Sequence, residues 1–129
     1  MKIEELNIEE SKELIDKITV RNRQLEINKV FLRKQRDGKL DEKKKLKESK
    51  SKKMKSLQEA IKKTNSKSLK DSKRKSKERE SNHFDSRISS KYKEIQRLRD
   101  AITKIDKEKA HNSKLKDMVR IHLKKLKSN

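Results

Sequence analysis

Residues 7–38 read NIEESKELIDKITVRNRQLEINKVFLRKQRDG and carry the clearest structural pattern of the chain. Asn7 followed by Glu10 has the spacing of a capping box, in which two side chains satisfy free backbone amides at the start of a helix. At the other end, Asp37-Gly38 supplies a residue suited to the left-handed conformation that ends many helices. We therefore expect a helix that begins near Asn7 and ends at Gly38.

The apolar residues of this segment predict two stripes at helical spacing. One stripe comprises Leu14, Ile15, Ile18, Leu25 and Leu32. The other lies on nearly the opposite side and comprises Val20, Ile27 and Phe31. Two apolar faces most often indicate the core of a helical bundle. The alternative is a helix that packs on one partner and docks a second, so Val20, Ile27 and Phe31 are candidate protein-docking residues.

After Gly38 the helical pattern resumes over residues 41–63. One narrow face is apolar and most of the rest is lysine. A short Asp-Gly connection lets two helices fold back on each other, which predicts a helical hairpin over residues 1–63.

Residues 64–89 are rich in Ser, Lys and Arg, and their large apolar side chains are Leu69, Phe84 and Ile88. A segment with so little to bury should be a disordered tether when free in solution. Residues 90–129 regain the helical pattern, with an interruption expected at 111–113. The predicted fold is all-α with elongated helices: an N-terminal helical hairpin, a basic low-complexity tether and a C-terminal helical arm, without a compact independent core.

Composition excludes several classes of protein. Of 129 residues, 27% are hydrophobic, far below the roughly 45–50% of an ordinary globular domain. With one Gly and no Pro, the chain lacks the residues that form the tight turns of sheet proteins. The lack of Cys excludes disulfides and thiolate metal sites. The three His have no spaced partner residues, so we expect no enzyme activity, cofactor, metal or small-molecule substrate.

No apolar run approaches the length of a membrane span, and the acidic start is unlike a signal peptide. We therefore expect no membrane partner and an intracellular location, cytoplasmic or nuclear and nucleolar.

The charge of the chain is large and uneven. There are 41 Lys and Arg against 21 Asp and Glu, a formal net charge of +20. Residues 1–20 form an acidic head with three Lys and six acids. The excess of positive charge in the rest of the chain would oppose compaction unless an anionic partner compensated it. This favours nucleic acid as the partner. The candidate phosphate contacts are Arg33, Arg36, Lys43, Lys44, Lys47, Lys52, Lys55, Lys67, Lys70, Lys73, Arg74, Lys75, Lys77, Arg79, Arg97 and Arg99.

The chain has too few aromatic residues to stack bases and lacks a sequence-reading module. We therefore expect clamping of structured RNA, such as rRNA, in a large ribonucleoprotein, the ribosome or an assembly particle, with the acidic head facing protein neighbours. One alternative is a coiled-coil structural or adaptor protein, although Asn22, Lys29 and Arg99 interrupt the stripes and no strict heptad is expected through three repeats. Another is a DNA- or chromatin-binding protein.

Short stretches in two parts of the chain resemble a known family. Residues 1–6 (MKIEEL) with 38–40 (GKL), and residues 95–102 (IQRLRDAI), are similar to the small two-helix ribosomal protein family near the peptide-tunnel exit. A long basic segment separates these stretches where that family has a short turn. The resemblance therefore adds to the ribosomal expectation and assigns no residue a role.

Overall fold

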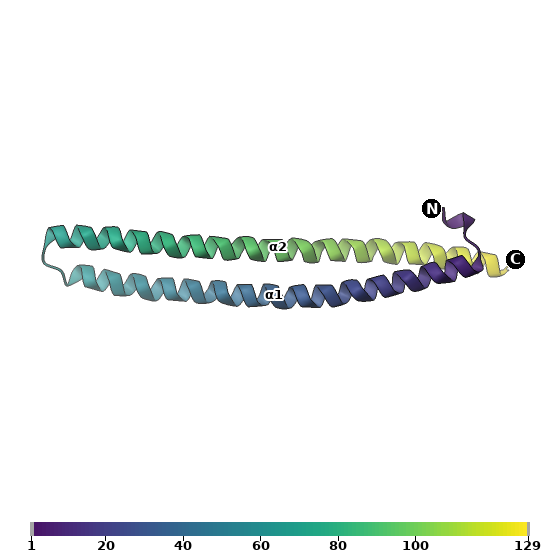
Figure 1. Ribbon diagram of the computed structural model, residues 1–129, viewed down its shortest axis with the longest axis horizontal. Coiled ribbons are helices and arrows are strands. Elements are labelled where there is room, and N and C mark those ends of the chain that lie inside the picture. Colours follow the sequence, from purple (N-terminus) through teal and green to yellow (C-terminus); the bar gives the residue numbers. More distant parts are fainter. Residues whose placement is uncertain (1, 129) are drawn as a thin grey trace. The chain divides into compact units, whose positions relative to one another are not determined.

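The computed structural model describes residues 2–128, and these form a short 3-10 helix and two long α-helices (Figure 1). The 3-10 helix η1 spans Ile3–Glu5, α1 spans Ile8–Lys62 and α2 spans Lys67–Ser128. No β-strand occurs among the described residues. The prediction of an all-α fold with long helices is confirmed.

The predicted capping box starts α1. The backbone amide of Asn7 donates to Glu10 Oε1 at 3.1 Å, and the backbone amide of Glu10 donates to Asn7 Oδ1 at 2.8 Å. Each side chain thus satisfies a backbone donor that lacks a partner within the helix. The start of α1 is therefore determined by four neighbouring residues, as predicted.

The predicted turn at Gly38 is wrong, because α1 continues through it to Lys62. A glycine inside a helix costs only about 1 kcal/mol relative to alanine, which packing against a second helix readily offsets. Leu32, Lys39 and Leu46 continue a half-buried row across this point. A Cβ atom added at Gly38 would meet nothing within 4 Å, so no close approach requires the glycine.

Replacing Gly38 by Ala should therefore raise the free energy of unfolding by about 0.5–1 kcal/mol, because alanine restricts the unfolded chain and fits the helix without strain. Urea unfolding followed by circular dichroism measures this change. The matched control is Ala110→Gly, at an exposed position within α2, which should lower the free energy by a similar amount. Destabilisation by Gly38→Ala would show that the chain turns there after all.

The chain reverses direction at residues 63–66 instead. Thr64 Oγ donates to the Ala60 carbonyl at 2.8 Å at the end of α1. Ser66 Oγ accepts a hydrogen bond from the amide of Leu69 at 3.4 Å at the start of α2. Two hydroxyl side chains thus satisfy backbone groups on either side of the reversal, and no described residue needs a positive φ.

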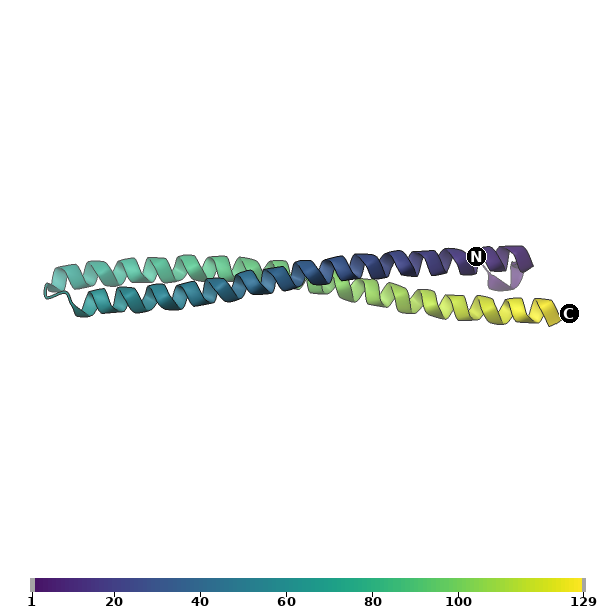
Figure 2. The same ribbon diagram turned by 90° about the horizontal axis from the view of Figure 1, so that it is seen from below.

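Contacts divide the chain into two units. The first contains Met1–Lys34 and Arg99–Asn129, and the second contains Gln35–Leu98. Within each unit, a segment of α1 lies antiparallel beside a segment of α2, as both views show (Figures 1 and 2). Each unit is therefore a pair of helices that can bury only one face of each helix.

The buried side chains form a narrow seam between the two helices. In the first unit they are Ser11, Ile18, Leu25, Ile102 and Val119, and in the second they are Ile61 and Ile95. Ile18 and Leu25 belong to the first predicted stripe, which is confirmed as the buried face of α1. At the N-terminal end, His122 Nε2 lies 2.9 Å from the Leu6 carbonyl oxygen, which ties the segment before α1 to α2.

The predicted disordered tether is wrong, because residues 67–89 belong to α2. Phe84 and Ile88 are half-buried. Lys50 Nζ lies 2.5 Å from Asp85 Oδ1, and a hydrogen bond at 2.8 Å joins Lys77 Nζ to Gln58 Oε1. Polar side chains occupy much of the inward face here, so the segment lacks the apolar period by which a helix is predicted.

The predicted break at residues 111–113 is also wrong, because α2 is continuous to Ser128. The side-chain amide of Asn112 donates to Asn22 Oδ1 at 3.0 Å across the seam of the first unit. Asn112 thus forms a contact between the helices rather than part of a break in α2. Within residues 2–128, neither helix contains a stretch apolar enough to cross a membrane.

Candidate nucleic-acid interface

Two rows of α1 residues face α2 at seven-residue intervals. Their members are Ser11, Ile18, Leu25, Leu32, Lys39 and Leu46 in one row, and Ile15, Asn22, Lys29, Arg36, Lys43 and Lys50 in the other. All are buried or half-buried. Such spacing is typical of coiled coils, but every member of the second row except Ile15 is polar. The rows therefore agree with the expectation that no strict apolar heptad continues through three repeats. Asn22 and Lys29, predicted as interruptions, occupy the second row, whereas Arg99 is exposed.

Ion pairs join α1 to α2 in both units. In the first unit they are Arg21–Glu108 at 3.2 Å, Lys29–Asp106 at 2.5 Å and Glu26–Lys109. In the second unit they are Lys39–Glu94 at 3.3 Å, Glu42–Lys91 at 2.8 Å and Lys50–Asp85 at 2.5 Å. Three polar positions of the seam, Lys29, Lys39 and Lys50, are therefore matched by acidic residues on the facing helix.

These pairs shift the titration of the residues in them. The hydrogen bond from Lys109 lowers the pKa of Glu26, and the hydrogen bond from Lys29 lowers the pKa of Asp106. In the second unit, the hydrogen bond between Lys91 and Glu42 lowers the pKa of Glu42 and raises the pKa of Lys91. Each shift favours the charged form that the ion pair requires.

Acid should therefore destabilise the helix pairs. A carboxyl group whose pKa is lowered by folding stabilises the protein above its unfolded pKa, and this contribution is lost as the pH falls through its folded pKa. We expect the melting temperature to fall below about pH 4.5, the ordinary value for Glu26 and Glu42. For Lys91, whose pKa is raised by folding, the stabilisation is lost only above its ordinary 10.5. Thermal melts followed by circular dichroism from pH 7 to pH 2.5 measure the acid effect.

The control for the acid prediction is the double variant Glu26→Gln and Glu42→Gln. It removes two of the titrating groups while the rest of the seam keeps its residues. Its melting temperature should be lower than that of the parent at pH 7 and should depend less on pH between 5 and 3. An equally steep fall in both proteins would show that these ion pairs do not stabilise the fold.

The positive charge of the second unit is concentrated around the chain reversal. We define the basic tip as residues 43–79, which flank the turn at 63–66. It holds seventeen Lys and Arg and four Asp and Glu, a surplus of thirteen positive charges. The rest of the second unit, residues 35–42 and 80–98, holds six of each sign. The entire net charge of this unit therefore lies in the basic tip.

Seven predicted phosphate contacts in the basic tip are exposed and have no side-chain partner among the described residues. They are Lys44, Lys47, Lys52, Lys55, Lys67, Lys75 and Arg79. None of the seven forms an ion pair with another described residue. Arg33, Arg97 and Arg99 are likewise exposed and unpaired among residues 2–128, but they lie outside the basic tip. The structure thus gathers seven free cations from two distant stretches of sequence at one end of a helix pair.

The remaining predicted contacts are engaged within the chain or half-buried. Lys43 Nζ lies 5.0 Å from the centre of the Tyr92 ring, Arg36 pairs with Asp37 and Arg74 pairs with Asp71. Lys73 donates to Thr64 Oγ at 2.8 Å, Lys77 donates to Gln58, and Lys70 is half-buried. A nucleic acid would have to compete with these contacts, so they are weaker candidates than the seven free residues.

Sequence reasoning missed other members of the same surface. Lys53, Lys62 and Lys63 are exposed, and they have no ion-pair partner among the described residues. Lys62 and Lys63 lie at the end of α1, where positive charge also complements the helix dipole. Their proximity to a chain reversal was the missing signal, because the turn was predicted at Gly38.

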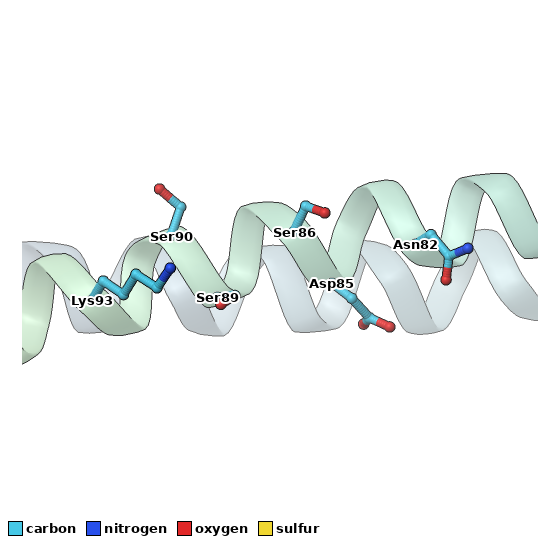
Figure 3. A pocket seen from close by; sticks show the side chains of 6 residues that line it. All are labelled: Asn82, Asp85, Ser86, Ser89, Ser90 and Lys93. Atoms are coloured by element: carbon cyan, nitrogen blue, oxygen red, sulfur yellow. The ribbon is translucent and has the colours of Figure 1, made fainter.

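A shallow hollow on α2 does not resemble a small-molecule site. It is lined by Asn82, Asp85, Ser86, Ser89, Ser90 and Lys93, all from one helix. Ser86 and Ser90 point to one side of α2, whereas Asp85 points to the other (Figure 3). Asp85 is already paired with Lys50. Among residues 2–128, no group of three His, Asp or Glu side chains is placed to hold a metal ion.

Comparisons of this chain with protein-family models, with curated proteins and with solved structures found no match.

Proposed function

We propose that the basic tip clamps the phosphates of structured RNA without reading its sequence. The observation that carries this proposal is the separation of charge in the second unit. Acidic residues neutralise the cations outside the basic tip, whereas the tip holds a surplus of thirteen positive charges and seven exposed, unpaired candidates. A surplus confined to one end of a helix pair favours an anionic partner at that end.

Phosphate is the anion that such a surface suits best. A nucleic-acid duplex presents about one phosphate per 1.7 Å of its axis, and an α-helix rises about 1.5 Å per residue. Lysines every three or four residues are about 4.5–6 Å apart along a helix, so a helix that lies along a duplex has about three phosphates within each interval. Each neutralised phosphate releases condensed counterions, which supplies affinity without base contacts.

Aromatic residues do not provide an alternative mode of recognition. Lys43 Nζ lies over the ring of Tyr92, and Phe84 is half-buried. Tyr92 and Phe31 are 52% and 61% exposed, but neither belongs to the basic tip, and residues 43–79 contain no aromatic residue. Single-strand recognition by stacking at the basic tip is therefore not supported. A folded RNA offers dense phosphates and a wide, shallow minor groove to a rigid helical surface. We place this activity in a ribonucleoprotein, the ribosome or an assembly particle, inside the cell and with protein neighbours.

The adaptor alternative has its own support. The seven-residue repeat along α1 and the exposed residues Val20, Ile27 and Phe31 are typical of proteins that associate through helices. This function uses a surface of the first unit, whereas phosphate binding uses the basic tip of the second. Both activities can therefore be tested separately in the same protein.

The decisive experiment compares binding of the full chain to duplex RNA, to duplex DNA of matched sequence and to polyglutamate, by fluorescence anisotropy at several salt concentrations. If about six phosphates are neutralised, affinity for RNA should fall about 1,000-fold between 50 and 200 mM salt. Binding that barely responds to salt would refute the phosphate clamp. A preference for DNA would favour the chromatin alternative, and equal competition by polyglutamate would indicate an acidic protein partner.

A further inference from the structure

The outer face of α1 in the first unit is apolar at its centre. Val20, Ile27 and Phe31 are 63%, 57% and 61% exposed, and Val30 is 43% exposed. These side chains lie on the side opposite the seam that buries Ile18. The expectation that this stripe forms bundle core is thus wrong, and the docking alternative applies to residues that the fold leaves uncovered.

A line of four residues along this face has opposite charges at its ends. Glu13, Val20, Ile27 and Lys34 follow one another at seven-residue intervals, which is close to two helical turns. They therefore share one line along α1. Glu13 and Lys34 are exposed, and neither forms an ion pair with another residue within 2–128.

This line is complementary to itself when it is reversed. Read in the opposite direction it places a cation, two apolar residues and an anion where the original has an anion, two apolar residues and a cation. Two copies of α1 in antiparallel contact would therefore match charge with opposite charge and apolar with apolar residues. Self-complementarity about a two-fold axis is the property that an isologous dimer interface requires.

We propose that this face of α1 binds the same face of a second copy of the chain. The two-fold axis passes between Val20 and Ile27, so each Val20 packs on Ile27 of the second copy. Glu13 then pairs with Lys34 of the second copy, twice per dimer. The first unit also has a shallow hollow lined by Asp16, Lys17, Val20, Arg21 and Gln24. In this register the exposed Phe31 of one copy faces that hollow in the other.

This inference does not rest on RNA binding, because every residue in it belongs to the first unit. It specifies the occupant of the docking surface as a copy of the chain itself. An unrelated acidic or basic helix would satisfy only one end of the line, whereas a second copy satisfies both. Association should be measured on the full chain, without nucleic acid, by sedimentation equilibrium at several protein concentrations.

We expect the parent protein to form a reversible dimer, so the fraction of monomer should rise as the protein concentration is lowered. Ile27→Asp should weaken dimerisation at least about 100-fold, because it buries an unpaired charge at the centre of the interface. The matched control is Ile121→Asp, on α2 of the same unit, where the isoleucine is also 57% exposed. This control should dimerise like the parent, and both variants should retain the helical circular dichroism spectrum.

Charge reversal at the two ends of this line tests whether the predicted ion pairs form, which apolar packing alone would not require. Glu13→Lys and Lys34→Glu should each weaken the dimer about tenfold, because each places like charges opposite one another twice. The double variant that carries both changes should regain the affinity of the parent. Failure of the double variant to recover, or a parent that stays monomeric at every concentration tested, would overturn the proposal.

The register can be tested by a disulfide, because the chain has no cysteine of its own. In the proposed dimer the two copies of Gln24 lie next to the two-fold axis, so Gln24→Cys should form a cross-linked dimer on mild oxidation. Ser113→Cys, at an exposed position of α2, is the matched control and should remain largely uncrosslinked. Equal cross-linking of both variants would show that association is not through this face.

Discussion

Replacing Lys52, Lys55, Lys67 and Lys75 by Gln should weaken binding to duplex RNA at least about 100-fold at 100 mM salt. These four lysines are exposed, and none has an ion-pair partner among the described residues. The replacements remove their charges and disturb no cross-helix ion pair. The slope of log affinity against log salt should also become shallower by up to about four, one for each lost phosphate contact. Anisotropy titrations at several salt concentrations measure both quantities.

The matched control changes the same number of lysines in the first unit, namely Lys104, Lys107, Lys114 and Lys124. All four are exposed on α2 and unpaired within residues 2–128, so their replacement by Gln makes the same change in net charge. If RNA responded only to total charge, both variants would lose equal affinity. That result would contradict a localised basic tip, whereas a selective loss in the tip variant would support it.

The second large effect concerns stability rather than binding. Ile95 is 1% exposed and is one of only two buried apolar residues in the described part of the second unit. Ile95→Ala should lower the free energy of unfolding by about 2–4 kcal/mol, because it removes buried methyl groups and leaves a cavity. A single narrow seam has few other contacts to compensate this loss. Urea unfolding followed by circular dichroism measures the change.

Ile121→Ala is the control for this prediction. The same atoms are removed from the same helix, but Ile121 is 57% exposed, so the expected change is within about 0.5 kcal/mol. Both variants should be measured at one low protein concentration, so that any self-association affects them equally. Similar values for the two would show that Ile95 does not lie in a packed seam between α1 and α2.

Features that depend on neighbouring residues could be predicted from the sequence. The capping box of Asn7 and Glu10 needs only four consecutive residues, so its spacing was sufficient to place the start of α1. The buried face of α1 was predicted for a similar reason, because Ile18 and Leu25 repeat at helical spacing. Both features follow from the geometry of a single helix.

The position of the chain reversal depends on a second helix. Glycine at position 38 makes the helix less stable by about 1 kcal/mol relative to alanine. The packing of α1 against α2 on both sides of Gly38 outweighs this cost, so the helix continues. Residues 67–89 lack an apolar period because their inward positions include Lys77 and Ser81. Their helix is supported by partners such as Gln58 on α1, which are far away in the sequence.

The amino-acid sequence by itself determined that the chain is helical, basic and short of apolar residues. Only the tertiary structure decided which cations are free. Lys50 and Lys52 are equivalent as sequence, yet Lys50 lies at the seam and pairs with Asp85, whereas Lys52 is exposed and unpaired among the described residues. The physical reason is that net charge is a sum over residues, whereas neutralisation requires an opposite charge within a few ångströms, and for Lys50 that neighbour comes from the other helix.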